Sequence, residues 1–268
     1  MTEKLKNILW PLGFGVAFLA VWQLGWFHAL LNLAPFQLPV PSEIVDTLVA
    51  KFPKAMNDCG VTVSGALVGM ILGSAIGFVV AVVATMFPKW GYGGLIVISA
   101  LNAIPIVALS PIMNRWFATG MEQKIGVVTV VTMAAMAINA YRGLNDLRPF
   151  SLDLMKSYAA KGPTVFFHLR LPNALPGVFT ALKINITTAM IAAIVSEYFA
   201  ASTSGLGFGI KDNLRKAEMA SGWAYITIAS VAGVFLFLVI AFIERRVLKW
   251  HASQNPEVVE KRRPVKVG

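Results

Sequence analysis

Six long apolar blocks, almost free of charge, follow one another along the chain and are separated by short polar segments. A helix needs about 20 predominantly apolar residues to cross a bilayer, and each block is close to or above that length. The pattern predicts an all-α integral membrane protein with six transmembrane helices. The blocks are Ile8 to about Leu33, the interval between Asp58 and Lys89, Gly91 to about Asn114, Ile125 to Tyr141, about Pro176 to Ala201, and about Gly222 to Ile243.

The start of the chain allows two interpretations, a first transmembrane helix or a cleaved signal peptide. The apolar run is longer than the ~7–15 residues of a signal-peptide core, and no small-x-small cleavage site follows it. We therefore expect an uncleaved helix that ends at the proline-rich segment Pro35 to Pro41. Ser42 is then placed to cap a short amphipathic helix from Glu43 to Lys51.

The second block carries a glycine at every fourth position, at Gly65, Gly69, Gly73 and Gly77. Residues four apart lie on one face of a helix. In lipid, such a stripe lets two backbones approach closely and gain dispersion contacts. We expect this span to be the most tightly packed one.

Polar residues inside the third and fourth blocks are candidates for the lining of a translocation pathway. Pro105 frees a backbone carbonyl within the third block, and Asn102 stands one turn before it. Such breaks persist where neighbouring helices or a water-lined cavity satisfy the freed group. Asn139, near the end of the fourth block, is a further candidate. A structural kink without a transport role is the alternative.

The fifth block is the most polar one. On a helix, Asn185, Thr188, Ala192 and Ser196 share one face, while Lys183, Thr187, Ile194 and Glu197 fall on the other side. We expect Glu197 near the membrane surface. Because an ionisable group inside a membrane is a functional hypothesis by default, Asn185, Thr188, Ser196 and Glu197 are pathway or gate candidates. Structural hydrogen bonding or ion pairing is the alternative.

Composition supports the membrane class. Hydrophobic residues make up 57% of the chain, charged residues 13%, and the mean hydropathy is +0.69, values that exclude an ordinary soluble protein. We expect one permease-like membrane domain over residues 1–268, with a disordered basic tail from about 252 to 268. No spacer indicates a second domain.

The net charge of +10 would suggest nucleic acid as a partner of a soluble protein, but here the cations flank apolar spans. Most Lys and Arg residues fall in segments on the same side as the N-terminus. The positive-inside rule therefore places both termini and the loop from about 142 to 171 in the cytoplasm. The partners we expect are membrane lipid and proteins, not nucleic acid.

Motifs for catalysis or cofactor binding are missing from the sequence. Cys59 is the single cysteine, the three histidines are far apart, and no HExxH, CxxC, paired-carboxylate or GxxxxGK[ST] pattern occurs. The glycine-rich run Gly205 to Gly209 follows no predicted strand, so we do not expect nucleotide binding there. We predict it to lie in an extracytoplasmic loop, with Lys211 to Glu218 forming a charged surface helix. No metal, cofactor or catalytic residue is expected.

Residues 149–176, PFSLDLMKSYAAKGPTVFFHLRLPNALP, form a cationic island between two apolar blocks, and we name this segment the elbow. Ser151 is placed to cap a short helix with Asp153 in its first turn. Gly162 is expected to end that helix, and Pro163 to begin a second one that Pro172 breaks. The alternative is a plain connection between two spans.

The elbow resembles a cytoplasmic loop of binding-protein-dependent ABC importer permeases, whose pattern is E-A-A-x3-G-x9-I-x-L-P. The end of the pattern matches Leu171 and Pro172, with Leu169 at the Ile place. Ala159 stands at the Gly place, and Asp153 at the Glu place. The runs LRLPNALPGVFTALKI, AAIVSEYFAASTSGLGFGI, NAIPIVALSPI, FQLPVPSEI and ERRVLKWH extend the similarity to the nitrate/sulfonate/taurine type and its thiamine-precursor relatives over almost the whole chain.

The resemblance implies the fold of a type I ABC importer permease with cytoplasmic coupling helices in the bacterial cytoplasmic membrane. The implied partners are an ATPase subunit, which would bind ATP and Mg²⁺, and an extracytoplasmic solute-binding protein; two copies would form a homodimer. The elbow would contact the ATPase. The implied contact residues are Asp153, Lys156, Ala159, Lys161, Gly162, Pro163, Phe166, Phe167, Leu169, Leu171 and Pro172, with Arg170 among the cations that would orient the partner.

The solute stays open, because such relatives transport small anions such as nitrate, sulfonates and taurine, or pyrimidine vitamin precursors. Lys183 is the one cation within a predicted span, so the sequence offers little for a strong anion site. Two other function classes are alternatives. A membrane-embedded enzyme would need a constellation of catalytic residues, and an ATP-independent carrier or channel is expected to show an inverted repeat.

Overall fold

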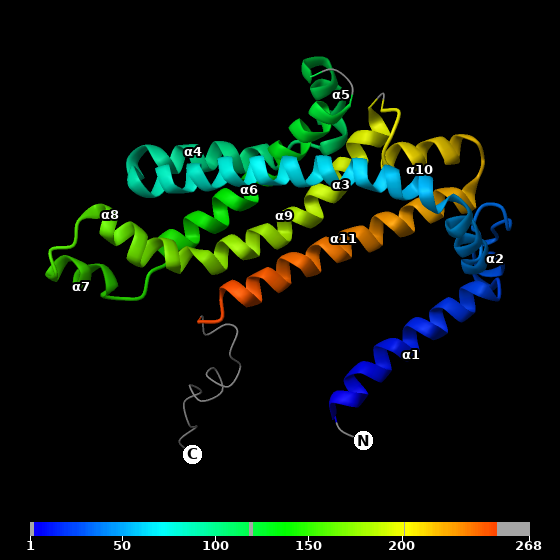
Figure 1. Ribbon diagram of the computed structural model, residues 1–268, viewed down its shortest axis with the longest axis horizontal. Helices are drawn as coiled ribbons and strands as arrows, with labels where there is room; N and C mark the ends of the chain where they lie inside the picture. Colours follow the sequence, from blue (N-terminus) through cyan, green and yellow to red (C-terminus); the bar gives the residue numbers. More distant parts are fainter. Residues whose placement is uncertain (1–2, 118–119, 201, 251–268) are drawn as a thin grey trace.

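The computed structural model describes residues 3–117, 120–200 and 202–250, and this part of the chain is built of helices without a strand (Figure 1). The prediction of an all-α protein is therefore confirmed. The basic tail predicted from about 252 to 268 lies outside the described residues. In chain order the elements are α1 (Glu3–Gln23), α2 (Trp26–Leu31), α3 (Pro41–Met86), α4 (Pro88–Leu101), α5 (Ile106–Phe117), α6 (Met121–Asn145), α7 (Ser151–Ser157), α8 (Gly162–Val165), a π-helical turn (Phe166–Arg170), α9 (Leu171–Phe199), α10 (Leu206–Arg215) and α11 (Met219–Val247).

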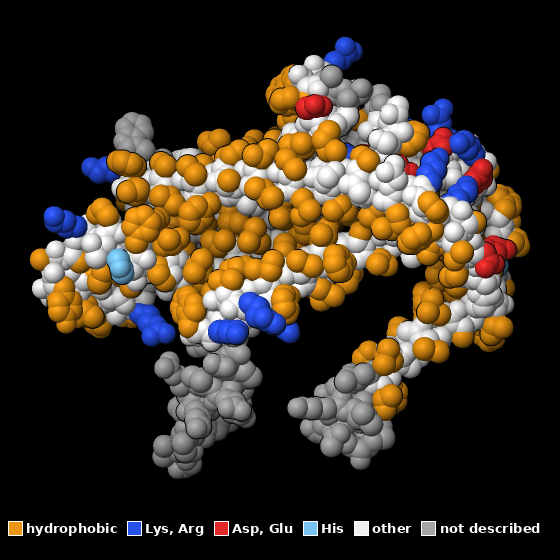
Figure 2. Space-filling view, viewed as in Figure 1, with side chains coloured by type: hydrophobic (Ala, Val, Ile, Leu, Met, Phe, Trp, Pro, Cys, Tyr) orange, Lys and Arg blue, Asp and Glu red, His pale blue; other side chains and the backbone are white. Residues whose placement is uncertain are grey.

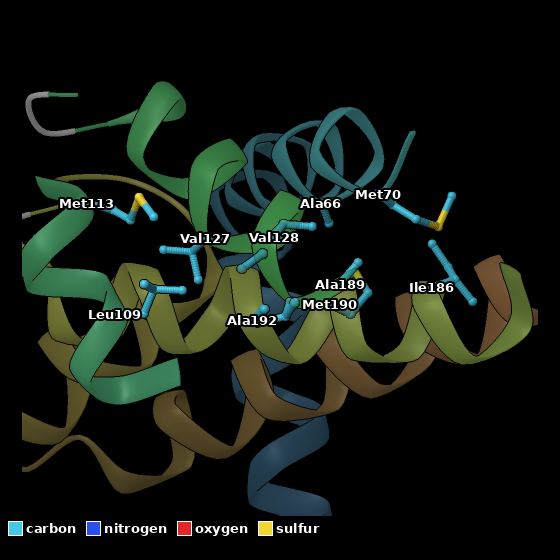
Figure 3. Close-up of a cluster of buried hydrophobic side chains, with 12 residues drawn as sticks. Ala66, Met70, Leu109, Met113, Val127, Val128, Ile186, Ala189, Met190 and Ala192 are labelled. Carbon is cyan, nitrogen blue, oxygen red and sulfur yellow. The ribbon is translucent and has the colours of Figure 1, made fainter. Parts of the chain in front are cut away.

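Helices α3, α6 and α9 pack against one another as the centre of a bundle, and α11 lies along α3 and α9. The short helices α7 and α8 stand at one end of this bundle and α10 at the other, while α1 extends away from it (Figure 1). The largest apolar cluster fills the space between α3, α5, α6 and α9 (Figure 3). Its members include Ala66, Met70, Leu109, Val127, Val128, Ile186, Ala189 and Ala192.

The glycine stripe of α3 faces α6, as the four-residue spacing predicts. A Cβ atom at Gly69 would lie 2.9 Å from the carbonyl oxygen of Ile125 and 2.6 Å from Cβ of Val128. Non-bonded carbon atoms pack at about 3.5–4.0 Å, so Gly69 has no room for a side chain. The expectation of unusually close helix packing is confirmed.

The described residues contain four helices, or five spans if one bent pair is counted, that are long and apolar enough to cross a membrane. Among the described residues, α3, α6, the continuous helix of residues 162–199 and α11 are each long and apolar enough to cross a membrane. Helices α4 and α5 form a fifth span only as a pair, and the pair is bent by 101°. The apolar part of α1, Leu9–Gln23, is shorter. The six-span count therefore stays a prediction, whereas the break predicted around Pro105 is present.

The amphipathic helix and the second span are one element, not two. Helix α3 runs unbroken from Pro41 to Met86 and includes Pro53, so the predicted end at Lys51 is wrong. The predicted cap at Ser42 is also wrong, because the helix begins at Pro41. Ser42 instead exchanges two hydrogen bonds with Gln23, at 2.9 and 3.0 Å, which tie the end of α1 to the start of α3.

The sides of the bundle expose a continuous apolar surface, whereas charged side chains gather at its ends (Figure 2). Most apolar side chains of α11 point outward, including Val231, Phe235 and Leu238. In a soluble protein such a surface would cause association. In this chain it is the surface that lipid or another apolar membrane segment covers.

Candidate functional site

The elbow folds differently from the sequence prediction, although it does contain two short helices. Phe150, not Ser151, precedes the first helical residue of α7, and Gly162 begins α8 and does not end α7. The chain reverses at Ala159, whose φ of 52° is left-handed. Ala159 is the residue at the Gly place of the family pattern, and glycine is the residue that adopts this conformation without steric cost.

Pro172 does not break the helix, contrary to the prediction. A π-helical turn over Phe166–Arg170 joins α8 to α9, and the N–H of Leu171 donates to the carbonyl of Phe166. This wider turn lies directly before Pro172, and the helix continues through the proline although it has no N–H to donate. One continuous helical stretch of residues 162–199 results.

The elbow is fixed to the bundle by Phe166, Arg170 and Asn173. Phe166 packs into the cluster that contains Ala140 and Ala174. Arg170 donates to the carbonyl of Leu144 at 3.0 Å and to Asn145 Oδ1 at 2.9 Å, and Asn173 donates to the carbonyl of Gly143 at 2.7 Å. Arg170 therefore anchors the elbow to the end of α6, and its expected role in orienting a partner stays a prediction.

The outer face of the elbow is apolar and exposed. Phe150, Leu154 and Tyr158 follow one another at intervals of four residues and are 81%, 59% and 77% exposed, and Phe167 is 61% exposed. We name these four side chains the elbow patch. Lys156 and Lys161 are exposed as well, and Lys156 pairs with Asp153 at 3.1 Å. Gly162 and Pro163 are exposed, whereas Leu169, Leu171 and Pro172 are half-buried.

Sequence reasoning identified only Phe167 of the elbow patch. The signal that was present is the four-residue spacing of Phe150, Leu154 and Tyr158, which places them on one face of a helical turn. An exposed patch of this kind at the tip of an anchored projection is suited to contact another protein.

The strained turn at Ala159 yields the first testable prediction. Ala159→Gly should stabilise the elbow by about 1 kcal/mol, because glycine removes the left-handed strain of alanine. Hydrogen exchange of the α7 amides and the thermal unfolding midpoint measure the gain. The control is Ala160→Gly, at a residue outside the left-handed region, which should bring no gain. Equal effects at both positions would contradict the assignment.

The predicted pathway residues do not meet in one place. Asn102 and Pro105 are exposed at the α4–α5 break. Asn139 donates to the carbonyl of Ala135 at 2.8 Å, and Thr188 to that of Ile184 at 3.0 Å. Asn185 and Ser196 are buried; Asn185 donates to Ser74 Oγ at 3.0 Å, and Ser196 donates to the carbonyl of Ala193. Within one chain, the buried side chains of Asn185 and Ser196 form structural hydrogen bonds, and their role in a pathway stays a prediction.

Glu197 is completely buried among other helices, in the last turn of α9 at the end of the bundle opposite the elbow; its predicted place near the membrane surface stays a prediction. Its carboxylate forms an ion pair with Lys124 of α6. The hydroxyl of Thr62 lies 2.9 Å from both carboxylate oxygens and donates to them, and the N–H of Gly207 donates to Oε2 at 2.8 Å. Lys124, which directly precedes the fourth predicted span, is only 2% exposed.

Asp58 extends the same network to α11. It accepts from the N–H of Gly205 at 3.0 Å and from the hydroxyl of Tyr225 at 2.9 Å. The Thr62 hydroxyl also accepts from the N–H of Leu206 at 2.8 Å. We name Asp58, Thr62, Lys124 and Glu197, with the amides they hold, the carboxylate clamp. It joins α3, α6, α9, α10 and α11 at one point.

Other charged contacts lie at both ends of the bundle. Lys183 of α9 pairs with Glu244 of α11 at 2.7 Å, so the lysine is not a free cation. Near α10, a hydrogen bond from Lys51 lowers the pKa of Glu218. Among the residues that the structure describes, no group of three or more His, Cys, Asp or Glu side chains is placed to hold a metal ion.

Comparisons with known proteins agree on one family. Residues 69–249 match the model of the family described as "Binding-protein-dependent transport system inner membrane component". The chain is 25% identical to the formylaminopyrimidine transport permease protein ThiX of Halalkalibacterium halodurans, over 94% of this chain and all of that protein. It is 26% identical to the taurine transport system permease protein TauC of Escherichia coli, over 92% of each.

A solved structure shares the fold. The crystal structure of an amino acid ABC transporter with histidines superposes with a TM-score of 0.60 at 16% identity, and the match covers 74% of this chain and 96% of that chain.

Proposed function

Because this chain belongs to the family of binding-protein-dependent transport system inner membrane components and is the permease subunit of an ABC importer, we propose that the elbow patch docks on a separate ATPase subunit. The observation that carries this proposal is the exposed apolar patch of Phe150, Leu154, Tyr158 and Phe167 on an elbow anchored by Phe166. The chain has no P-loop motif of its own.

The mechanism follows from the continuity of the helix. When ATP binding closes the ATPase pair, the docked elbow moves, and the unbroken helix of residues 162–199 carries this motion into the bundle. The close packing of α3, α6 and α9 makes them shift between two discrete arrangements and not deform gradually. Access to the pathway changes from one side of the membrane to the other.

The assembly that this mechanism requires contains two permease chains, two ATPase subunits and a solute-binding protein. We propose a homodimer of this chain with both termini and the elbow in the cytoplasm, as the distribution of Lys and Arg indicates. Helix α10, at the opposite end of the bundle, then faces the solute-binding protein. ATP and Mg²⁺ belong to the ATPase subunits.

For the solute we propose an aminopyrimidine-like or zwitterionic molecule and not a small inorganic anion. Lys124 of α6 and Lys183 of α9 are both paired with carboxylates, so neither offers a free positive charge inside a span. ThiX and TauC are named for a formylaminopyrimidine and for taurine. Binding of such compounds, with nitrate as the comparison, to the purified solute-binding protein tests the choice.

Copurification tests the proposed assembly. The affinity-tagged chain, solubilised from membranes in mild detergent, should bring down an ATPase subunit whose sequence contains the P-loop motif, and liposomes with this complex should take up solute only with ATP. Solute uptake by the purified chain alone, without ATP, would instead support an ATP-independent carrier.

A further inference from the structure

The first turn of α10 is held by side chains from two other helices. A helix leaves its first backbone N–H groups without partners inside the helix, and a capping side chain or water usually accepts from them. Here three successive N–H groups, of Gly205, Leu206 and Gly207, donate to Asp58, Thr62 and Glu197 at 3.0, 2.8 and 2.8 Å. Helix α10 is therefore attached to α3 and α9 by its own backbone.

Three glycines permit this attachment. Gly205 has a φ of +101°, and a Cβ atom there would collide with the carboxylate of Glu197. A Cβ atom at Gly207 would lie 2.8 Å from Cβ of Glu197, and one at Gly209 would lie 2.8 Å from Cζ of Tyr225. The glycine-rich run thus seats α10 directly on α9 and α11 without intervening side chains.

The elbow and the carboxylate clamp lie at opposite ends of one helix. Residues 162–199 form a continuous helical stretch, with α8 of the elbow at its start and Glu197 in its last turn. At ~1.5 Å per residue, such a stretch spans ~50 Å between the two sites. A displacement at one end is carried toward the other along this uninterrupted helix.

The other face of α10 is suited to a soluble protein. At the end of α10 and in the turn that follows it, Arg215, Lys216 and Glu218 are exposed; Lys216 pairs with Asp212 at 2.6 Å, and Glu218 pairs with Lys51. Figure 2 shows positive and negative side chains together at this end of the molecule. Such a surface binds through charged and polar contacts and is not one that lipid tails cover.

We infer that the carboxylate clamp couples two binding sites. Through it, the nucleotide state of an ATPase bound at the elbow changes the affinity of α10 for a solute-binding protein, and the reverse. The inference rests on the proposed function. Asp58, Thr62 and Glu197 act as positioning residues: they hold α10 to the core, so that the two partners bias the same conformational change. When the clamp is loosened, each partner still binds, but neither senses the state of the other.

Thr62→Val isolates this role. Valine keeps the shape of threonine and leaves the Lys124–Glu197 pair in place, but it removes the hydroxyl that links Leu206 to Glu197. The matched control is Thr132→Val, because Thr132 is equally buried between helices and its hydroxyl bonds only to carbonyls of its own helix, α6.

The experiment uses the assembled transporter in nanodiscs and the solute-binding protein purified without added solute. The Kd of the solute-binding protein is measured for the nucleotide-free transporter and for the transporter trapped with ATP and vanadate. In the native transporter the two Kd values should differ by at least about 5-fold, the low end of allosteric coupling. Thr62→Val should bring the ratio close to one and accelerate hydrogen exchange of the Leu206 amide; Thr132→Val should do neither.

An unchanged Kd ratio in Thr62→Val, or unchanged exchange at Leu206, would overturn the inference while leaving the proposed function intact. A native transporter that binds the solute-binding protein with equal Kd in both states would overturn it as well. If no ATPase or solute-binding protein binds the native chain at all, the proposed function itself fails.

Discussion

Leu154→Asp combined with Phe167→Asp should abolish recovery of the ATPase subunit with the permease while the permease itself stays in the membrane. Both side chains are exposed parts of the elbow patch; Phe167 also packs edge-on against Phe166, with 5.2 Å between the ring centroids. A carboxylate buried in an apolar contact keeps its desolvation cost without gaining a partner. Loss of two central apolar contacts should cost at least ~2 kcal/mol of binding, or about 30-fold in Kd.

The measurement is the Kd of purified ATPase for permease in nanodiscs, together with ATP hydrolysis by the complex. The matched control is Ser157→Asp, which places the same charge on α7 at an exposed residue that is already polar and should change the Kd little. If the double variant binds the ATPase with native affinity, the elbow patch is not the docking surface. A loss as large in Ser157→Asp would assign the effect to charge and not to apolar contact.

Features that depend on local periodicity were predictable from the sequence. The four-residue spacing of Gly65, Gly69, Gly73 and Gly77 predicts a helix face without side chains, and α6 packs on that face. The break around Pro105 follows equally from a single residue type with a fixed backbone conformation.

The elbow shows where local propensity fails. Gly162 was assigned as a helix end because glycine usually ends helices, but the reversal occurs at Ala159, and Gly162 starts α8. The glycine place of the family pattern coincides with this turn, since it falls on Ala159, although no turn was predicted from it. The helix propensity of a residue describes which backbone conformations it tolerates. The hydrogen bonds of Arg170 and Asn173 to α6 determine where the chain must reverse.

The carboxylate clamp was not predictable, because its members are distant in sequence and appear at the borders of apolar blocks. Asp58 and Lys124 stand at the borders of the second and fourth predicted spans, and a charge beside an apolar run normally marks the membrane surface. Each is buried because a partner from another helix compensates it, Tyr225 for Asp58 and Glu197 for Lys124. A single sequence carries no local signal for such pairing.

The buried ion pair leads to the second large effect. Lys124→Met and Glu197→Gln should each destabilise the folded permease by ~3–5 kcal/mol, the usual cost of leaving one buried charge without its partner. Lys124 would retain only the carbonyl of Val61, at 3.0 Å, and Glu197 only Thr62 and Gly207. The double variant should recover most of the loss, because glutamine still accepts from Thr62 and Gly207 and neither member of the pair carries a buried charge.

A double-mutant cycle on unfolding free energies, measured in mixed detergent with a titrated denaturant, separates the pair from its neighbours. The control is Lys183→Met: the Lys183–Glu244 pair is partly exposed, with side-chain exposures of 26% and 11%. Because this pair is less completely buried than Lys124–Glu197, Lys183→Met should cost less stability than Lys124→Met. The opposite outcome is a double variant that loses as much unfolding free energy as the two single variants together. In that case the ion pair does not stabilise the protein, and the hydrogen bonds of Glu197 to Thr62 and Gly207 stabilise the clamp.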